Sequence, residues 1–215
     1  MSRTPGSSGV KTMQEIREVG LRLIYEHGFA AMNLRQLAAE VGIQVGSLYN
    51  HIRNKQDLLF ELIRTHMEGL LDACDTEINN TNDPLLQLEA FVRFHLTYHL
   101  QRRLDVFVAN FELRSLEPLN YAAIVDMRRA YESVLIEILE RGAAARVFSV
   151  PDARVAAFAI LSMLTGVCTW YRPEGRLKES ELVAIHYRML LTGLTIPPLD
   201  TVPSSLPAGG LGVGA

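Results

Sequence analysis

Hydrophobic residues recur along most of the chain at the spacing of an α-helix, every three to four positions. The first amphipathic segment carries one such face, Ile16, Val19, Leu23 and Ile24, and a later segment carries another, Leu58, Leu62, Met67, Leu70 and Leu71. No stretch shows the sustained alternation of apolar and polar residues that is typical of a strand. The sequence therefore predicts an all-α fold.

The same periodicity, together with proline and glycine positions, sets the expected boundaries of nine helices. We expect them at residues 11–27, 34–41, 45–51, 55–78, 84–101, 103–114, 118–145, 152–171 and 179–194. The first three are short and closely spaced, whereas the others are mostly long. This contrast predicts a three-helix domain over residues 11–54 and a larger helical bundle over residues 55–196. The polar residues 1–10 and the Pro- and Gly-rich residues 197–215 are expected to be disordered tails.

Composition favours a soluble protein of the cytoplasm. The chain is 48% hydrophobic and 21% charged, as in ordinary globular proteins. Its two cysteines, Cys74 and Cys168, lie far apart inside apolar helical patterns, which suits reduced thiols better than a disulfide. The uncharged stretch 155–171 is shorter than the roughly 20 apolar residues of a membrane-spanning helix. We therefore expect no membrane partner.

Charge is distributed unevenly although the net charge is only −3. Residues 1–66 contain eight basic and six acidic side chains, so this part carries +2 and the remainder carries −5. The asymmetry is modest. It is compatible with a phosphate-bearing partner at the N-terminal domain.

The segment from residue 33 to residue 57 has the features of a helix-turn-helix. Asn33 is suited to cap the second helix, with Gln36 three positions later completing a capping box. Ala38 is small enough for a close helix crossing, and Gly42 can adopt the positive φ of the turn. A second capping pattern follows at Asn54 and Asp57. The alternative is a helical hairpin without any DNA function.

Side chains on the third helix are predicted to be exposed and mostly polar; they are Gln44, Val45, Ser47, Tyr49, Asn50 and His51. Gly46 lacks a side chain near the helix N-terminus, where free N–H groups can approach a phosphate. Lys55 lies in the first turn of the next helix and opposes its dipole, so contact with an anion would explain it. Tyr49 or His51 taken alone could simply pack within the domain.

The run from Gly28 to Leu59, GFAAMNLRQLAAEVGIQVGSLYNHIRNKQDLL, closely resembles the DNA-binding domain of TetR-family transcriptional repressors. The resemblance covers roughly residues 11–60. It implies phosphate contacts by Tyr49 and Lys55, with His51 and Arg35 as further candidates. It also implies that four side chains face the major groove, namely Gln44, Val45, Ser47 and Asn50. Gln44 stands where the family usually has Ser or Thr, Val45 where it often has Lys or Arg, and Ile52 where it usually has Phe.

The resemblance also implies a homodimer whose C-terminal bundle binds a small molecule. Helix 152–171 is apolar on nearly every side, so it must be covered extensively. Helix 179–194 has an apolar stripe, and two such pairs would form a four-helix interface. The alternative for helix 152–171 is an ordinary buried core helix.

Aromatic and arginine residues of the bundle are the candidates for an effector pocket. The aromatic candidates are Phe91, Phe94, Tyr98, Phe107, Phe111, Tyr121, Tyr131 and Trp170, and the arginines are Arg114, Arg128 and Arg172. The segment from Trp170 to Leu177, WYRPEGRL, resembles a loop of the TetR branch that senses acyl-CoA thioesters. An acyl-CoA is therefore the first effector expected, with a fatty acid or a hydrophobic aromatic compound as alternatives.

No motif for catalysis, a cofactor or a metal is expected. His95 and His99 have a spacing that can chelate a metal, but no carboxylate or cysteine cluster accompanies them. The sequence thus predicts a TetR-like repressor that binds double-stranded operator DNA as a dimer and is released by a small hydrophobic effector. The alternatives are a ligand-responsive activator, or a helical small-molecule-binding protein or enzyme without DNA function.

Overall fold

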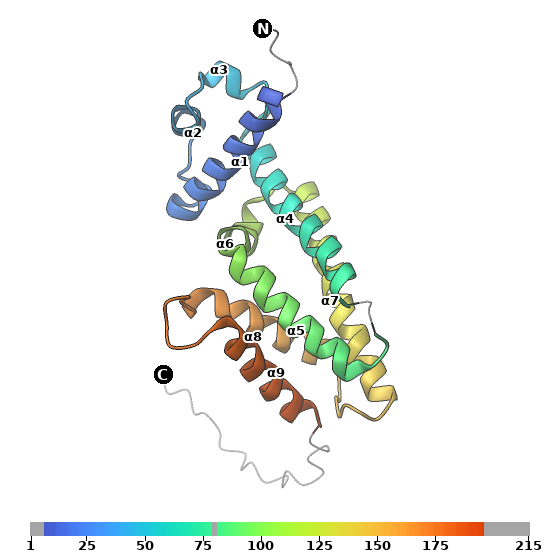
Figure 1. Ribbon diagram of the computed structural model, residues 1–215. Coiled ribbons are helices and arrows are strands. Elements are labelled where there is room, and N and C mark those ends of the chain that lie inside the picture. Colours follow the sequence, from blue (N-terminus) through green and yellow to red (C-terminus); the bar gives the residue numbers. More distant parts are fainter. Residues whose placement is uncertain (1–6, 79–80, 196–215) are drawn as a thin grey trace, which may run out of the picture.

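The computed structural model describes residues 7–78 and 81–195, and within these ranges the chain forms nine α-helices and one short 3-10 helix (Figure 1). The elements are α1 (Ser7–His27), α2 (Leu34–Val41), α3 (Val45–Leu48), α4 (Lys55–Ile78), α5 (Pro84–Gln101), α6 (Arg103–Phe111), η1 (Leu113–Ser115), α7 (Pro118–Ala144), α8 (Ala153–Trp170) and α9 (Glu179–Thr195). The all-α prediction is confirmed.

Three helix ends differ from the expected ones by more than one residue. Helix α1 begins at Ser7, so the last residues of the expected N-terminal tail are helical, while residues 1–6 and 197–215 lie outside the described ranges. Helix α3 ends at Leu48 because the amides of Asn50 and His51 bond three residues back, to Ser47 and Leu48, at 3.2 and 2.9 Å. The expected helix 103–114 divides at Glu112 into α6 and η1.

The turn between α2 and α3 forms as its residues predict. Gly42 has a φ of 77°, and the amide of Ile43 donates to the Ala38 carbonyl at 2.9 Å. Asn33 Oδ1 accepts the Gln36 amide at 2.8 Å, which confirms the cap. The reciprocal half of the capping box was predicted wrongly, because the Gln36 side chain donates to Glu40 at 3.0 Å instead.

The second predicted cap forms in the same way: Asn54 Oδ1 accepts the Asp57 amide at 2.9 Å at the start of α4. Two local signals of the sequence thus fix where α2 and α4 begin. The short helix α3 is held between them, with Leu48 fully buried in the core.

Helices α1 to α3 form one end of the molecule, and α4 runs from them into the bundle (Figure 1). Helix α5 is central to the bundle and packs against α4, α7, α8 and α9. Helix α6 lies at the junction, where it contacts both α1 and α4. One end of the bundle is therefore mechanically connected to the helix-turn-helix through α4 and α6.

The outer faces of α8 and α9 carry large apolar side chains in contact with solvent. Val155, Phe158, Ile185 and Met189 are 64%, 45%, 42% and 56% exposed. By length and composition α8 alone among the described helices could cross a membrane, but it has only 18 residues, of which 22% are buried. Because most of α8 is not buried, the alternative of an ordinary core helix is wrong.

Candidate DNA-binding surface and ligand cavity

Helix α3 presents a polar surface at the end of the molecule. Tyr49 is 53% exposed, and Gln44, Ser47 and Asn50 are exposed as well. Gln44 makes no side-chain cap, as expected from the loss of the family's usual Ser or Thr. The remaining two predicted side chains, Val45 and His51, are half-buried, and Val45 packs against the core. Val45 is therefore less available to DNA than its position on the helix suggested.

Gly46 is the one position of α3 that packing leaves unexplained. Its backbone is helical, and a Cβ built there meets no atom within 4 Å beyond its chain neighbours and the backbone of its own helix. Gly42 also has open space around it, but its positive φ requires glycine. Glycine is less favourable than alanine inside a helix, so neither packing nor helix propensity explains why residue 46 is a glycine.

Lys55 has partners inside the protein. Its Nζ donates to the Ala30 carbonyl at 3.0 Å and lies 4.5 Å from the centre of the Phe29 ring. Partial burial lowers the pKa of Lys55. These contacts give Lys55 a role inside the protein besides the expected contact with an anion, which stays a prediction; the residue is half-buried. Arg35, the other predicted phosphate contact, is exposed on α2.

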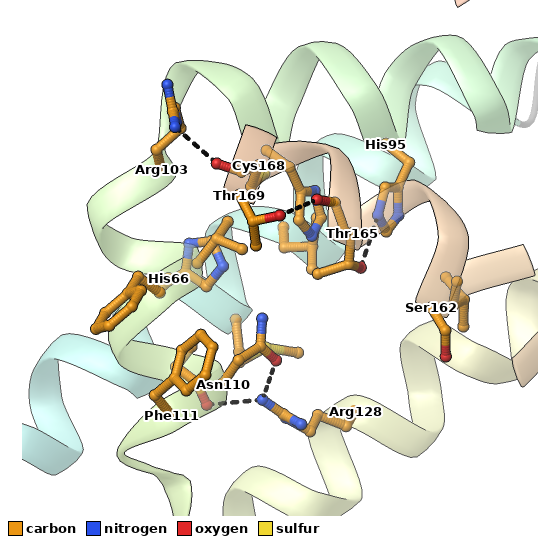
Figure 2. A pocket seen from close by; sticks show the side chains of 18 of the residues that line it. His66, His95, Arg103, Asn110, Phe111, Arg128, Ser162, Thr165, Cys168 and Thr169 are labelled. Carbon is orange, nitrogen blue, oxygen red and sulfur yellow. Dashed lines mark hydrogen bonds between the residues drawn. The ribbon is translucent and has the colours of Figure 1, made fainter. Parts of the chain in front are cut away.

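A cavity of about 610 Å³ lies inside the bundle between α4, α5, α6, α7 and α8. Its apolar lining comes from Tyr25, Met67, Leu70, Val106, Phe107, Ala109, Phe111, Tyr131, Leu161 and Gly166. Its polar lining comes from His66, His95, His99, Arg103, Asn110, Arg128, Glu132, Ser162, Thr165, Cys168, Thr169 and Arg172. Figure 2 shows His66, His95 and the polar residues of α8 on one side, with Asn110, Phe111 and Arg128 opposite.

Five of the predicted pocket residues line this cavity: Phe107, Phe111, Arg128, Tyr131 and Arg172. Six do not. Phe91, Phe94 and Tyr98 are buried in the core of the bundle, because their positions on α5 face neighbouring helices rather than the open space. Arg114, Tyr121 and Trp170 are exposed, and the Trp170 ring stacks on His186 with ring centres 6.3 Å apart.

Histidines are the main lining group that sequence reasoning did not place in the pocket. The spacing of His95 and His99 was noticed but weighed only as a metal site, and His66 was hidden within the apolar stripe of α4. His95 is fixed by contacts of its Nδ1 with the Tyr131 hydroxyl at 3.0 Å and its Nε2 with Thr165 Oγ1 at 3.1 Å. The His99 ring stacks on it at 3.8 Å. No group of three potential metal ligands is found within the described ranges.

The three histidines are neutral near pH 7. Burial is the main cause, and it lowers the pKa of His66 to about 4, that of His99 to about 3, and that of His95 well below its ordinary value. The positive charges of Arg102 and Arg128 lower the pKa of His66 further. The cavity therefore offers uncharged imidazole groups at this wall.

Arginines supply the positive charge of the cavity. Arg128 donates to the Ala109 carbonyl at 2.7 Å and to Asn110 Oδ1 at 2.8 Å, which joins α7 to α6. Arg103 donates to the Cys168 carbonyl at 2.7 Å, which joins α6 to the end of α8 (Figure 2). The cavity is lined by three arginines, Arg103, Arg128 and Arg172, and by one carboxylate, Glu132. Its wall therefore has an excess of positive charge.

Helix α6 contacts the cavity and the helix-turn-helix domain at once. Phe107 lines the cavity, and its ring meets that of Tyr25 on α1 edge-on with centres 4.7 Å apart. At the end of α6, Glu112 Oε1 accepts the Phe29 amide at 2.9 Å, and Oε2 accepts the Ser115 hydroxyl at 2.7 Å. A displacement of α6 by a ligand would act directly on α1 and the turn that follows it.

Comparison with known proteins agrees with this architecture over most of the chain. A family model described as "Tetracyclin repressor-like, C-terminal domain" matches residues 81–194, more than half of the chain. A second, described as "Bacterial regulatory proteins, tetR family", matches residues 16–62. The HTH-type transcriptional repressor KstR2 of Mycobacterium tuberculosis is 24% identical over 185 residues, which cover 84% of this chain and 92% of the relative.

Solved structures share the fold. A bacterial regulatory protein of the tetR family from Rhodococcus RHA1 matches with a TM-score of 0.80 and 27% identity, covering 86% of this chain and 97% of that one. AibR in complex with isovaleryl coenzyme A and operator DNA matches with a TM-score of 0.77 and 24% identity, covering 84% and 98%. The two family models match the helix-turn-helix and the bundle from residue 81 to residue 194. The chain belongs to the TetR family, whose members are transcriptional regulators rather than enzymes.

Proposed function

We propose that the protein is a transcriptional repressor of the cytoplasm that binds operator DNA as a homodimer and is released by an acyl-CoA thioester in the cavity. The observation that carries the proposal is the shared helix α6: Phe107 lines the cavity while touching Tyr25 of the helix-turn-helix domain. In this proposal residues 11–54, with the added first turn of α1, bind DNA. Residues 55–196 bind the effector and the second subunit.

The DNA interface is α3 with its two flanking turns. Gln44, Ser47 and Asn50 are exposed side chains that can hydrogen-bond base edges in the major groove. Gly46 lets the backbone approach a phosphate, and Tyr49 donates its hydroxyl to one. Arg35, His51 and Lys55 add phosphate contacts around this centre, and Val45 has a peripheral role.

The homodimer is proposed to form through the outer faces of α8 and α9. Monomers rarely expose contiguous apolar surface of this kind, and Val155, Phe158, Ile185 and Met189 would be covered by the same residues of a partner. Such a dimer presents two α3 helices to successive major grooves, about 34–36 Å apart.

Three features favour an acyl-CoA as effector. The cavity combines an apolar lining with surplus arginine charge, which suits a ligand that has an acyl chain and phosphates. Arg172 lines the cavity and belongs to the WYRPEGRL segment, which resembles a loop of acyl-CoA sensors. AibR, which shares this fold, has been solved with isovaleryl coenzyme A and operator DNA.

Release of DNA is proposed to follow from a two-state equilibrium. A ligand that binds the non-DNA conformer more tightly shifts the population toward it by the difference in affinity. The path runs from Phe107 and Phe111 in the cavity wall, along α6, to the Glu112 bond with the Phe29 amide. A small displacement of α6 then changes the orientation of α1 and the spacing of the two α3 helices.

The DNA function is tested by fluorescence anisotropy with duplex DNA from the protein's own promoter region. Binding should weaken steeply as salt rises, because phosphate contacts release counterions. Tyr49→Ala should weaken binding at least tenfold without lowering the melting temperature, since Tyr49 is half-exposed, while Tyr121→Ala, at an exposed position of α7, should leave it unchanged. Equal affinity for DNA in the two variants would exclude the proposed interface.

The effector class is tested by adding acyl-CoA thioesters of increasing chain length to the protein–DNA complex. At least one of them should release the DNA at a concentration at which free coenzyme A releases none. Failure of the whole series would exclude acyl-CoA while leaving the DNA interface standing.

A further inference from the structure

The imidazole of His66 is a buried polar group without a hydrogen-bond partner at one of its nitrogens. The residue is 7% exposed on α4 and lines the cavity. Its Nδ1 is buried and has no partner within the part of the chain that the structure describes. Because the enclosed Nδ1 has no hydrogen-bond partner in the described chain, it indicates which nitrogen of the neutral ring carries the proton.

Neighbouring groups do not supply that partner. His95 already uses both ring nitrogens, on Tyr131 and Thr165. The His99 ring meets that of His66 edge-on, with centres 6.3 Å apart, too far for a hydrogen bond between them. His99 Nδ1 also has no hydrogen-bond partner within the described chain. The backbone of His95 interacts with His99 and raises its pKa, so His66 is the clearer case of an unpaired imidazole.

The protonation state decides what His66 can offer. The neutral ring carries one N–H, on either Nδ1 or Nε2. A buried N–H without an acceptor is rarer in proteins than an acceptor with a spare lone pair. We therefore assign the proton to Nε2 and the free lone pair to the enclosed Nδ1, which makes Nε2 a donor available to a ligand in the cavity.

The surroundings of His66 combine apolar side chains with nearby positive charge. Met67, Leu70 and Val106 line the cavity beside this wall, so a group that reaches the imidazole lies among apolar side chains. Arg128 is on the opposite side and is engaged with Asn110 and the Ala109 carbonyl (Figure 2). Its charge and that of Arg102 act on His66, which favours a partner with negative charge density, such as a carbonyl oxygen. In an acyl-CoA the uncharged oxygen next to the acyl chain is the thioester carbonyl.

We propose that His66 Nε2–H donates a hydrogen bond to the thioester carbonyl oxygen of an acyl-CoA bound in the cavity, and so selects thioesters over compounds that lack this oxygen. The inference rests on the proposed acyl-CoA function and adds the residue that reads the thioester. His66 is thus a specificity-determining residue that no motif of the sequence had indicated.

The test compares two ligands that differ only at the carbonyl: hexanoyl-CoA and its thioether analogue hexyl-CoA. Their affinities for the full-length protein are measured by isothermal titration calorimetry. The wild type should bind the thioester about tenfold more tightly, the usual worth of one well-placed hydrogen bond. His66→Phe retains a ring but no N–H and should bind both ligands equally, with little change for hexyl-CoA. His66→Gln retains an N–H donor and should restore part of the preference.

A measurement on the unmodified protein makes the test independent of how the variants fold. The ¹⁵N chemical shift of His66 Nε2 should move on adding hexanoyl-CoA but not hexyl-CoA. Binding of neither ligand would overturn the effector class proposed above, and this inference with it. Equal binding of both by the wild type, an equal loss of both in His66→Phe, or an unmoved Nε2 signal would overturn the role of His66 alone.

Discussion

Gly46 offers a direct separation of DNA contact from folding. A Cβ built at this position meets no atom within 4 Å beyond its chain neighbours and the backbone of its own helix, and the backbone is helical without a positive φ. Alanine is more favourable than glycine in a helix by roughly 0.5–1 kcal/mol. For a chain of this size about 2–4 °C in melting temperature corresponds to 1 kcal/mol, so Gly46→Ala should melt 1–4 °C higher, an estimate on the order of the helix gain.

The same substitution should weaken binding to DNA. If Gly46 lies against a phosphate, its new methyl group displaces a backbone N–H bond to a charged oxygen, worth about 1.5–3 kcal/mol. Each 1.4 kcal/mol is about a tenfold change, so one half-site loses about tenfold or more, and a dimer on two half-sites loses about a hundredfold or more. Fluorescence anisotropy with promoter duplex DNA and calorimetric melting measure the two effects.

Gly42→Ala is the matched contrast, because it also has open space around it but a φ of 77°. Alanine is strained there by about 1–2 kcal/mol, so this variant should melt lower while Gly46→Ala melts higher. Unchanged DNA affinity in Gly46→Ala would refute the close approach of α3 to a phosphate. A lower melting temperature in Gly46→Ala would refute the claim that the chain itself has no need of glycine there.

Three further outcomes are expected. Gly142→Ala should lower the free energy of unfolding by about 1–3 kcal/mol, because the new Cβ would overlap the Phe148 ring. The melting temperature should fall, and adding Phe148→Leu to the same chain should restore part of it. Burial lowers the pKa of His66 from 6.5 to about 4, so the unfolded chain binds more protons between these values. Stability should fall as the pH drops through this window, and His66→Gln should flatten the melting profile whereas His27→Gln, at an exposed position, should not. Glu112→Ala removes the carboxylate that accepts an amide of the helix-turn-helix domain at 2.9 Å, so the ratio of operator affinities without and with hexanoyl-CoA should shrink severalfold; an unchanged ratio would show that this bond carries no coupling.

Much of the fold was readable from local sequence. The caps at Asn33 and Asn54 and the turn at Gly42 formed as expected, since each depends on hydrogen bonds and torsion angles within a few residues. Apolar periodicity placed the helices within a few residues of their observed ends. The partners of Lys55 inside the protein, Ala30 and Phe29, were not indicated by the sequence, because they are about 25 residues away in the chain.

The cavity was the part that only the tertiary structure could decide. Phe91 and Phe94 were predicted to line the pocket because they are aromatic, yet both are buried in the core. A sequence does not distinguish a hydrophobic side chain that fills the core from one that lines a cavity. His66 and Arg128 come to the same cavity from α4 and α7, and no local pattern relates them. Periodicity and capping are set by neighbours along the chain, so the sequence by itself determined the helices and the helix-turn-helix. The open space between the helices depends on how α4 to α8 cross, and that decided which side chains face a ligand.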